Sequence, residues 1–197
     1  MTTDAEAGMR TQTIRVLAVI VALIASAVVT IPLRGDNESA REWPAVGGAS
    51  GNMHYSPLAQ ITAANVKDLG GAWMSEKFPT VASSRAMPVV KDGVMYVTVP
   101  PSVFALNPKT GATIWRYNSG GGRQAGPGQG APAREGVAVG DGKVFFGLSN
   151  ARAVALDAKT GAKIWDQYLG DNPRDKGQVI SGAPLYAGGL VSFGLSA

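Results

Sequence analysis

The chain has 197 residues and a formal net charge of +4, with 26 glycines, a content typical of many tight turns, and no cysteine. The lack of cysteine excludes a disulfide framework and a covalent haem attachment of the Cys-x-x-Cys-His type within this sequence. Lys and Arg are scattered singly rather than in runs, which argues against nucleic acid as a partner.

An apolar run near the N-terminus predicts export of the rest of the chain. Val16–Leu33 is broken only by Ser26 and Thr30, and arginines flank it at both ends. As a helix it is just long enough to span a bilayer, whereas Ala25-Ser26-Ala27 has the small-x-small form of a signal-peptidase site. Residues 1–33 are therefore expected to be a cleaved signal peptide or a membrane anchor. Because arginines precede the run, both alternatives predict a protein that is periplasmic, secreted or anchored to the cytoplasmic membrane facing outward.

Residues 34–42 read as a charged linker, and the segment that follows them contains one short helix signal. Thr62 is placed to cap a helix over Ala63–Leu69, and glycines follow that can end it. A strand is then expected to begin at Gly71-Ala72-Trp73-Met74.

A sequence motif, called the phrase below, occurs twice in the remaining sequence. Ala105–Trp115 reads ALNPKTGATIW, and Ala155–Trp165, 50 residues later, reads ALDAKTGAKIW. Each copy follows a strand-like run opened by a turn, at Asp92-Gly93 and at Asp141-Gly142, and a third opening begins at Gly188-Gly189. These pairs supply the positive φ angles that a two-residue hairpin turn needs. Repeats of about 40–50 residues built from short strands are typical of β-propeller blades.

The sequence therefore predicts an all-β fold, in which residues 43–197 form about three blades of an incomplete β-propeller, preceded by the hydrophobic helix. A closed propeller needs about 4–8 blades, so the chain is expected to be the N-terminal part of a larger protein. Trp115 and Trp165 are expected to bury their rings between adjacent blades. Asp157 has the chemistry of a catalytic carboxylate, but its counterpart in the other repeat is Asn107, and a turn-capping role explains both.

Three segments together resemble the pyrroloquinoline quinone (PQQ)-dependent alcohol dehydrogenases, quinoproteins of the eight-bladed propeller class. The segments are Trp43–Trp73, with its Trp-Pro, Gly-Gly and Tyr-Ser-Pro-Leu motifs, the paired phrases, and Ser181-Gly182-Ala183-Pro184 through Gly194-Leu195-Ser196-Ala197. The resemblance implies PQQ beside Ca²⁺ in a central channel, and an alcohol or sugar as substrate. It also implies a separate electron acceptor, a cytochrome or a quinone, and contact with a membrane if the N-terminal segment is not cleaved.

The resemblance assigns cofactor contacts to four residues and no catalytic residue or metal ligand. Ser181 falls where the family has a Thr or Ser that hydrogen-bonds the quinone. Ser196 and Ala197 fall in a segment whose serine hydroxyl and backbone contact a PQQ carboxylate. Arg134 stands one residue before the family's arginine and reaches a carboxylate of PQQ if its loop shifts.

At two charged positions the sequence departs from the family pattern. Arg85 stands where many members carry Glu, and Glu135 stands where they carry Arg. An adjacent cysteine pair that covers PQQ in many members is absent, and Gly120–Gly130 occupies its region. Arg85 is a candidate for pairing with a carboxylate.

A second interpretation is a non-catalytic propeller that acts as a scaffold in the cell envelope, of the outer-membrane assembly type. Such scaffolds share the paired phrases but lack the Trp43–Trp73 segment, which favours the dehydrogenase.

Overall fold

The computed structural model describes residues 42–48, 53–78, 85–120, 130–132, 135–171 and 177–196. All of them belong to the second of the two compact units into which the chain divides, Asn37–Ala197. The expected signal peptide or anchor over 1–33, its hydrophobic helix, and nearly all of the linker over 34–42 lie outside the described residues. Within the described ranges no helix has the length and apolar character needed to cross a membrane.

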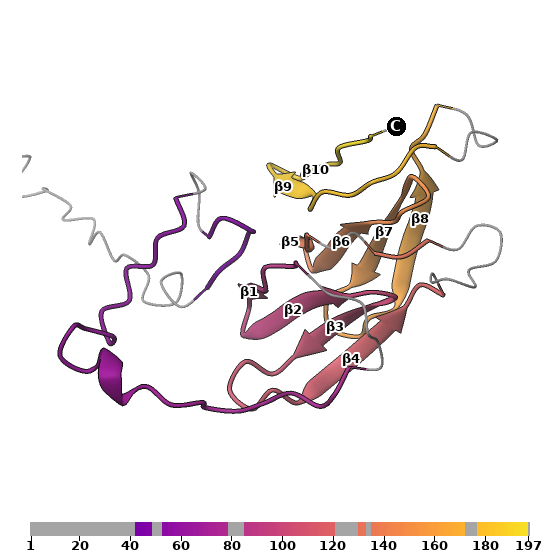
Figure 1. Ribbon diagram of the computed structural model, residues 1–197. Coiled ribbons are helices and arrows are strands. Elements are labelled where there is room, and N and C mark those ends of the chain that lie inside the picture. The colour runs from indigo at the N-terminus through magenta and orange to yellow at the C-terminus, as the bar shows by residue number, and fades with distance from the viewer. Residues whose placement is uncertain are drawn as a thin grey trace, which may run out of the picture. The chain divides into compact units, whose positions relative to one another are not determined.

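Two four-stranded antiparallel sheets follow one another along the chain, and a two-stranded hairpin comes after them (Figure 1). The first sheet contains β1 (Val89–Lys91), β2 (Val94–Val99), β3 (Ser102–Leu106) and β4 (Thr113–Asn118). The second contains β5 (Ala138–Gly140), β6 (Lys143–Gly147), β7 (Arg152–Asp157) and β8 (Lys163–Tyr168). The hairpin contains β9 (Leu185–Ala187) and β10 (Leu190–Ser192). Strands that pair in sequential order are the arrangement of propeller blades, which confirms the predicted all-β fold.

The hairpin turns have the geometry that their sequences predict. Asp92 and Gly93, which join β1 to β2, have φ angles of 51° and 73°. Asp141 and Gly142 repeat this between β5 and β6, with φ angles of 47° and 65°. Positive φ at both central residues defines the turn whose twist matches that of the flanking strands. The local signal therefore sets the register of each sheet.

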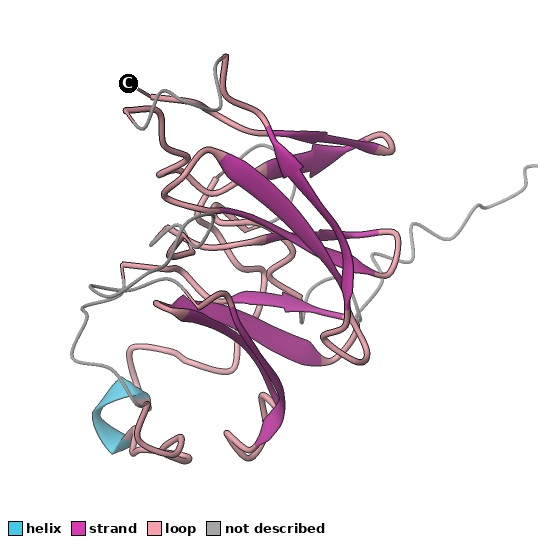
Figure 2. Ribbon diagram, turned by 90° about the vertical axis from the view of Figure 1, so that its right-hand side faces the viewer, coloured by secondary structure: helices cyan, strands magenta, loops and turns pink. Residues whose placement is uncertain are grey.

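The main hydrophobic core lies between the first and second sheets, which lie one above the other in Figure 2. Tyr117 of β4 meets Phe146 of β6 with ring centroids 5.8 Å apart. A smaller cluster joins the second sheet to the hairpin, where Phe145 stacks on Tyr186 at 5.6 Å. The fully buried core side chains come mostly from β3, β6 and β7, and include Val103, Phe104, Val144, Phe146, Val154 and Leu156.

The Trp115 side chain joins the first sheet to the turn between β7 and β8 of the second sheet. Its indole Nε1 donates a hydrogen bond to the carbonyl oxygen of Ala158 at 2.9 Å, and the side chain is 8% exposed. The ring lies against Gly161, where an added β-carbon would be 2.7 Å from Trp115 Cδ2. The predicted structural role of Trp115 is therefore confirmed. Trp165 packs against Phe145 of its own sheet and is half-buried, and the described residues include no third copy of the Lys-Thr-Gly turn.

Trp73 makes the same contact one repeat earlier, which sequence analysis missed. Its Nε1 donates to the carbonyl oxygen of Pro108 at 2.9 Å, and its ring fills the space beside Gly111. Pro108 and Gly111 occupy the places in the first phrase that Ala158 and Gly161 occupy in the second. The strand expected at Trp73 is not formed: the backbone has no strand partner among the described residues and is held by the indole instead.

The helix expected over Ala63–Leu69 is shorter and is not capped as predicted. A 3-10 helix covers Val66–Asp68, and its N-cap residue is Asn65 rather than Thr62. The Asn65 side-chain oxygen accepts a hydrogen bond from the Thr62 backbone N–H at 2.7 Å. This local side chain to backbone bond competes with the first turn of a longer helix.

Tyr96, in the core beneath Trp115, is expected to make stability depend on alkaline pH. Burial raises its pKa to about 12, and the carboxylates of Asp92 and Asp157 add to the rise. The folded state thus favours the neutral phenol, whose hydroxyl donates to the carbonyl oxygen of Ala158 at 3.2 Å. This contribution is complete below the ordinary pKa of 10.0 and is lost as the pH rises through about 12. Urea midpoints of Tyr96→Phe should fall less steeply over that range than those of the wild type, and equal slopes would contradict the assignment.

Candidate cofactor site

The first strands of the successive sheets lie next to one another. β1 contacts β5, and β5 contacts β9. In Figure 1 these three strands form a column on one side of the sheets, whereas β4 and β8 lie on the opposite side. Because the repeats run in the same sense, the segments that lead into β1, β5 and β9 come to the same end of this column. The described residues singled out at 85, 135 and 181 all belong to these leading segments.

An ion pair joins the two charged positions at which the sequence departs from the family pattern. Arg85 Nη2 lies 3.3 Å from Glu135 Oε1, so the guanidinium donates a hydrogen bond to the carboxylate. The Arg85 side chain is 75% exposed and that of Glu135 is 36% exposed. The pair spans 50 residues of sequence and connects the segment before β1 to the segment before β5. The carboxylate that Arg85 contacts is thus one of the chain's own, that of Glu135, whereas pairing of Arg85 with a carboxylate of the cofactor stays a prediction.

One backbone bridge joins the segments that carry two of the predicted cofactor residues, Ser181 and Ser196. Val179 and Ser196 form an antiparallel bridge, with N–O distances of 2.8 Å and 3.0 Å. Ser181 follows this bridge by two residues, and both serines are exposed. Neither hydroxyl has a hydrogen-bond partner within the described ranges, so both are available as donors to a ligand. The other two predicted residues, Arg134 and Ala197, lie outside the described residues.

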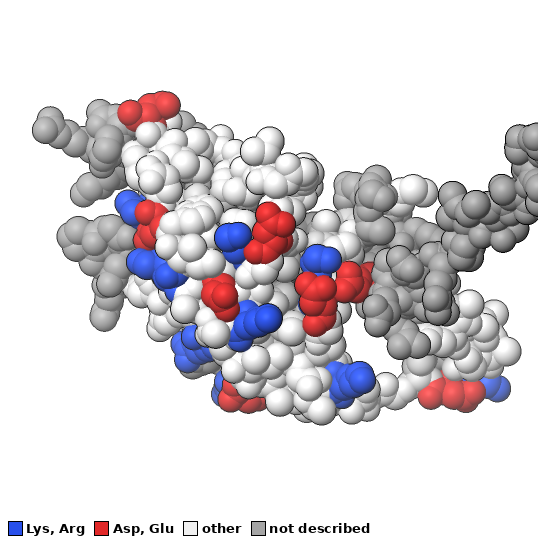
Figure 3. Space-filling view, turned by 180° about the vertical axis from the view of Figure 1, so that it is seen from behind, with Lys and Arg blue, Asp and Glu red and all other residues white. Residues whose placement is uncertain are grey.

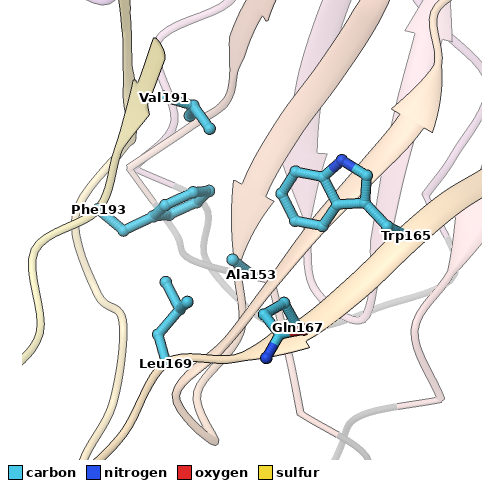
Figure 4. A pocket seen from close by; sticks show the side chains of 6 residues that line it. All are labelled: Ala153, Trp165, Gln167, Leu169, Val191 and Phe193. Atoms are coloured by element: carbon cyan, nitrogen blue, oxygen red, sulfur yellow. The ribbon is translucent and has the colours of Figure 1, made fainter.

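A cavity of about 380 Å³ lies elsewhere, between the second sheet and the hairpin (Figure 4). Its lining is apolar apart from Gln167, and comprises Ala153, Trp165, Gln167, Leu169, Val191 and Phe193. At the equivalent place between the first two sheets, Tyr117 fills the space against Phe146. Gln167 holds the position of Tyr117 in the second repeat, so the cavity is a less filled interface between sheets. A lining without charge does not suit a cofactor with three carboxylates.

The chemistry of the described side chains suits an anionic organic ligand better than a metal ion. Arg85, Ser181 and Ser196 offer a guanidinium and two hydroxyls, which are donors that match carboxylate and quinone oxygens. No cluster of three or more His, Cys, Asp or Glu side chains that could hold a metal occurs in the described ranges. On the face shown in Figure 3, acidic and basic side chains are interspersed, with no large field of one sign. The donor groups of these residues therefore match the chemistry of PQQ oxygens, and none of the three side chains is a carboxylate that Ca²⁺ would prefer.

Comparison with known proteins gives consistent matches. Residues 43–168 match the PQQ family model described as glucose/ethanol/alcohol dehydrogenase, β-propeller domain. The chain is 42% identical over 156 residues to the 1-butanol dehydrogenase (cytochrome c) of Thauera butanivorans, which covers 78% of this chain and 22% of that protein.

Solved structures of two enzymes are also similar to the chain. The quinohemoprotein alcohol dehydrogenase ADHIIG from Pseudomonas putida HK5 has a TM-score of 0.71 and 36% identity, over 81% of this chain and 24% of that one. A europium-containing methanol dehydrogenase has a TM-score of 0.66 and 32% identity, over 79% of this chain and 27% of that one. The chain thus spans about a quarter of the length of the relatives that it matches.

Proposed function

Because the chain belongs to the PQQ-dependent glucose/ethanol/alcohol dehydrogenase β-propeller family, we propose that it is the N-terminal part of an enzyme that oxidises an alcohol or a sugar. The enzyme passes the electrons to a separate acceptor, a cytochrome or a quinone. The observation that carries the proposal is the family match over residues 43–168, which covers both four-stranded sheets. The name of the Thauera relative includes an alcohol and cytochrome c, which supports this substrate class and this kind of acceptor.

The residues of this chain would bind and orient the cofactor rather than carry out the chemistry. When bound, PQQ supplies the redox chemistry by accepting two electrons from the substrate. Ser181 and Ser196 offer hydroxyl donors to its oxygens, and we propose that Arg134 and the backbone of Ala197 contribute further contacts. The Ca²⁺ ligands and the catalytic base are proposed to come from other parts of the enzyme, so the 197-residue chain by itself is expected to be inactive.

We propose further that the sheets lie outside the cytoplasm, in the periplasm or beyond it. The apolar run Val16–Leu33, with arginines before it, supports this location through either a signal peptide or a membrane anchor. An uncleaved segment would attach the enzyme to the cytoplasmic membrane with the propeller facing outward.

The proposed function predicts activity that depends on both PQQ and Ca²⁺. In the complete protein that carries this sequence, adding PQQ and Ca²⁺ is expected to produce reduction of an electron-accepting dye with ethanol or 1-butanol. Removing Ca²⁺ with a chelator should abolish dye reduction, since a hard cation is needed to polarise the quinone carbonyl. Fluorescence titration of the same protein with PQQ measures binding separately from turnover. A complete protein that binds no PQQ in the presence of Ca²⁺ would contradict the proposal.

A further inference from the structure

The position of Arg85 in the repeat is equivalent to that of a predicted cofactor residue. Arg85 stands seven residues before Asp92, which begins the hairpin turn after β1. Ser181 stands seven residues before Gly188, which begins the turn after β9. Because β1 and β9 hold corresponding places in their repeats, Arg85 and Ser181 lead into them at the same end of the column of first strands.

The ion pair with Glu135 does not use the full binding capacity of Arg85. A guanidinium has five N–H donors, and only Nη2 contacts Glu135 in the described structure. With 75% of the Arg85 side chain exposed, the remaining donors are accessible to a ligand. An exposed ion pair also contributes little to stability, so the fold does not depend on keeping the pair closed. The contact can therefore be exchanged for another carboxylate at small cost.

We propose that Arg85 is the cationic anchor for a carboxylate of PQQ, and that Glu135 is its counter-ion, which competes with the ligand for the guanidinium. Relative to the family pattern the two charges have changed places, so the positive charge is retained at this end of the column but comes from the segment before β1. This inference rests on the proposed function and identifies a binding residue for it. It concerns affinity for the cofactor, because Arg85 holds the ligand and takes no part in moving electrons.

If Glu135 competes with PQQ for the Arg85 guanidinium, substitutions of these two residues should have opposite effects on the affinity for PQQ. In the complete protein with Ca²⁺ present, the dissociation constant of PQQ is measured by quenching of tryptophan fluorescence. Arg85→Gln is expected to weaken binding by about tenfold or more, since it removes charge-assisted hydrogen bonds. Glu135→Gln is expected to tighten binding by about threefold or more, because the competing carboxylate is gone. Lys163→Gln is the control: it removes another cation from a surface ion pair, that with Asp166 at 3.5 Å, and should leave the affinity unchanged.

The same titration separates this inference from the proposed function. If the wild type binds PQQ but both substitutions weaken binding, or neither changes it, the pair is only structural and the inference is wrong while the proposed function stands. If the wild type binds no PQQ, the proposed function fails and the inference fails with it. Thermal unfolding of each variant checks the fold. Should Arg85→Gln not fold, Arg85→Lys replaces it, and a loss of affinity smaller than tenfold but measurable is expected because the charge stays and the planar donor fork is lost.

Discussion

Replacing Trp115 by alanine is expected to lower the free energy of unfolding by about 3–5 kcal/mol. The indole is buried between the first and second sheets and belongs to the core that holds them together. Its removal leaves a cavity against Gly161 and Tyr96, which the backbone of the adjacent turn cannot close. Urea denaturation followed by circular dichroism measures the change.

Trp165 is the matched control, because it occupies the same register position in the second repeat. Trp115 stands opposite Ala105 and Trp165 stands opposite Ala155, each beside a bulge at the same place. Trp165 is half-buried and covers no turn of a following sheet among the described residues, so Trp165→Ala should cost less than half as much. Equal losses would show that docking onto the next turn is not what makes Trp115 important.

Features set by local interactions could be predicted from the sequence. Asp157 Oδ1 accepts hydrogen bonds from the backbone N–H groups of Lys159 and Thr160, at 3.0 Å and 2.8 Å. Asn107 Oδ1 accepts one from Lys109 N–H at 2.8 Å in the first repeat. The bonds from Thr160 lower the pKa of Asp157, as expected for a carboxylate that serves a turn. Turn-capping therefore replaces the catalytic role that the residue type suggests.

Features that depend on distant partners could not be predicted. The charges of Arg85 and Glu135 were visible in the sequence, but only the packing of β1 against β5 brings them together across 50 residues. The sequence predicts a strand at Trp73. The place of this tryptophan before the first repeat was a usable signal that its ring packs on the turn of that repeat. For Ser181 and Ser196 the resemblance indicated a shared site, and the structure adds that one antiparallel bridge holds their segments together.

Gly140→Ala is expected to destabilise the junction between the second sheet and the hairpin by about 1–3 kcal/mol or more. Gly140 is the last residue of β5 and is buried, and a β-carbon there would overlap the ring of Tyr186 on β9. Its φ angle is not among the positive ones, so the effect is steric rather than conformational. The Tyr186 ring is also stacked on Phe145, which prevents it from moving aside.

A double-mutant cycle with Tyr186→Ala tests this overlap directly. The three atoms nearest to a β-carbon at Gly140 all belong to the Tyr186 ring, so Gly140→Ala should cost much less once the ring is removed. Gly70→Ala is the control, since a β-carbon at Gly70 would meet nothing within 4 Å. Urea midpoints of the four proteins in the cycle give the coupling energy. If Gly140→Ala is as costly in the Tyr186→Ala background as in the wild type, the glycine is required by the backbone of β5 and not by the approach of β9.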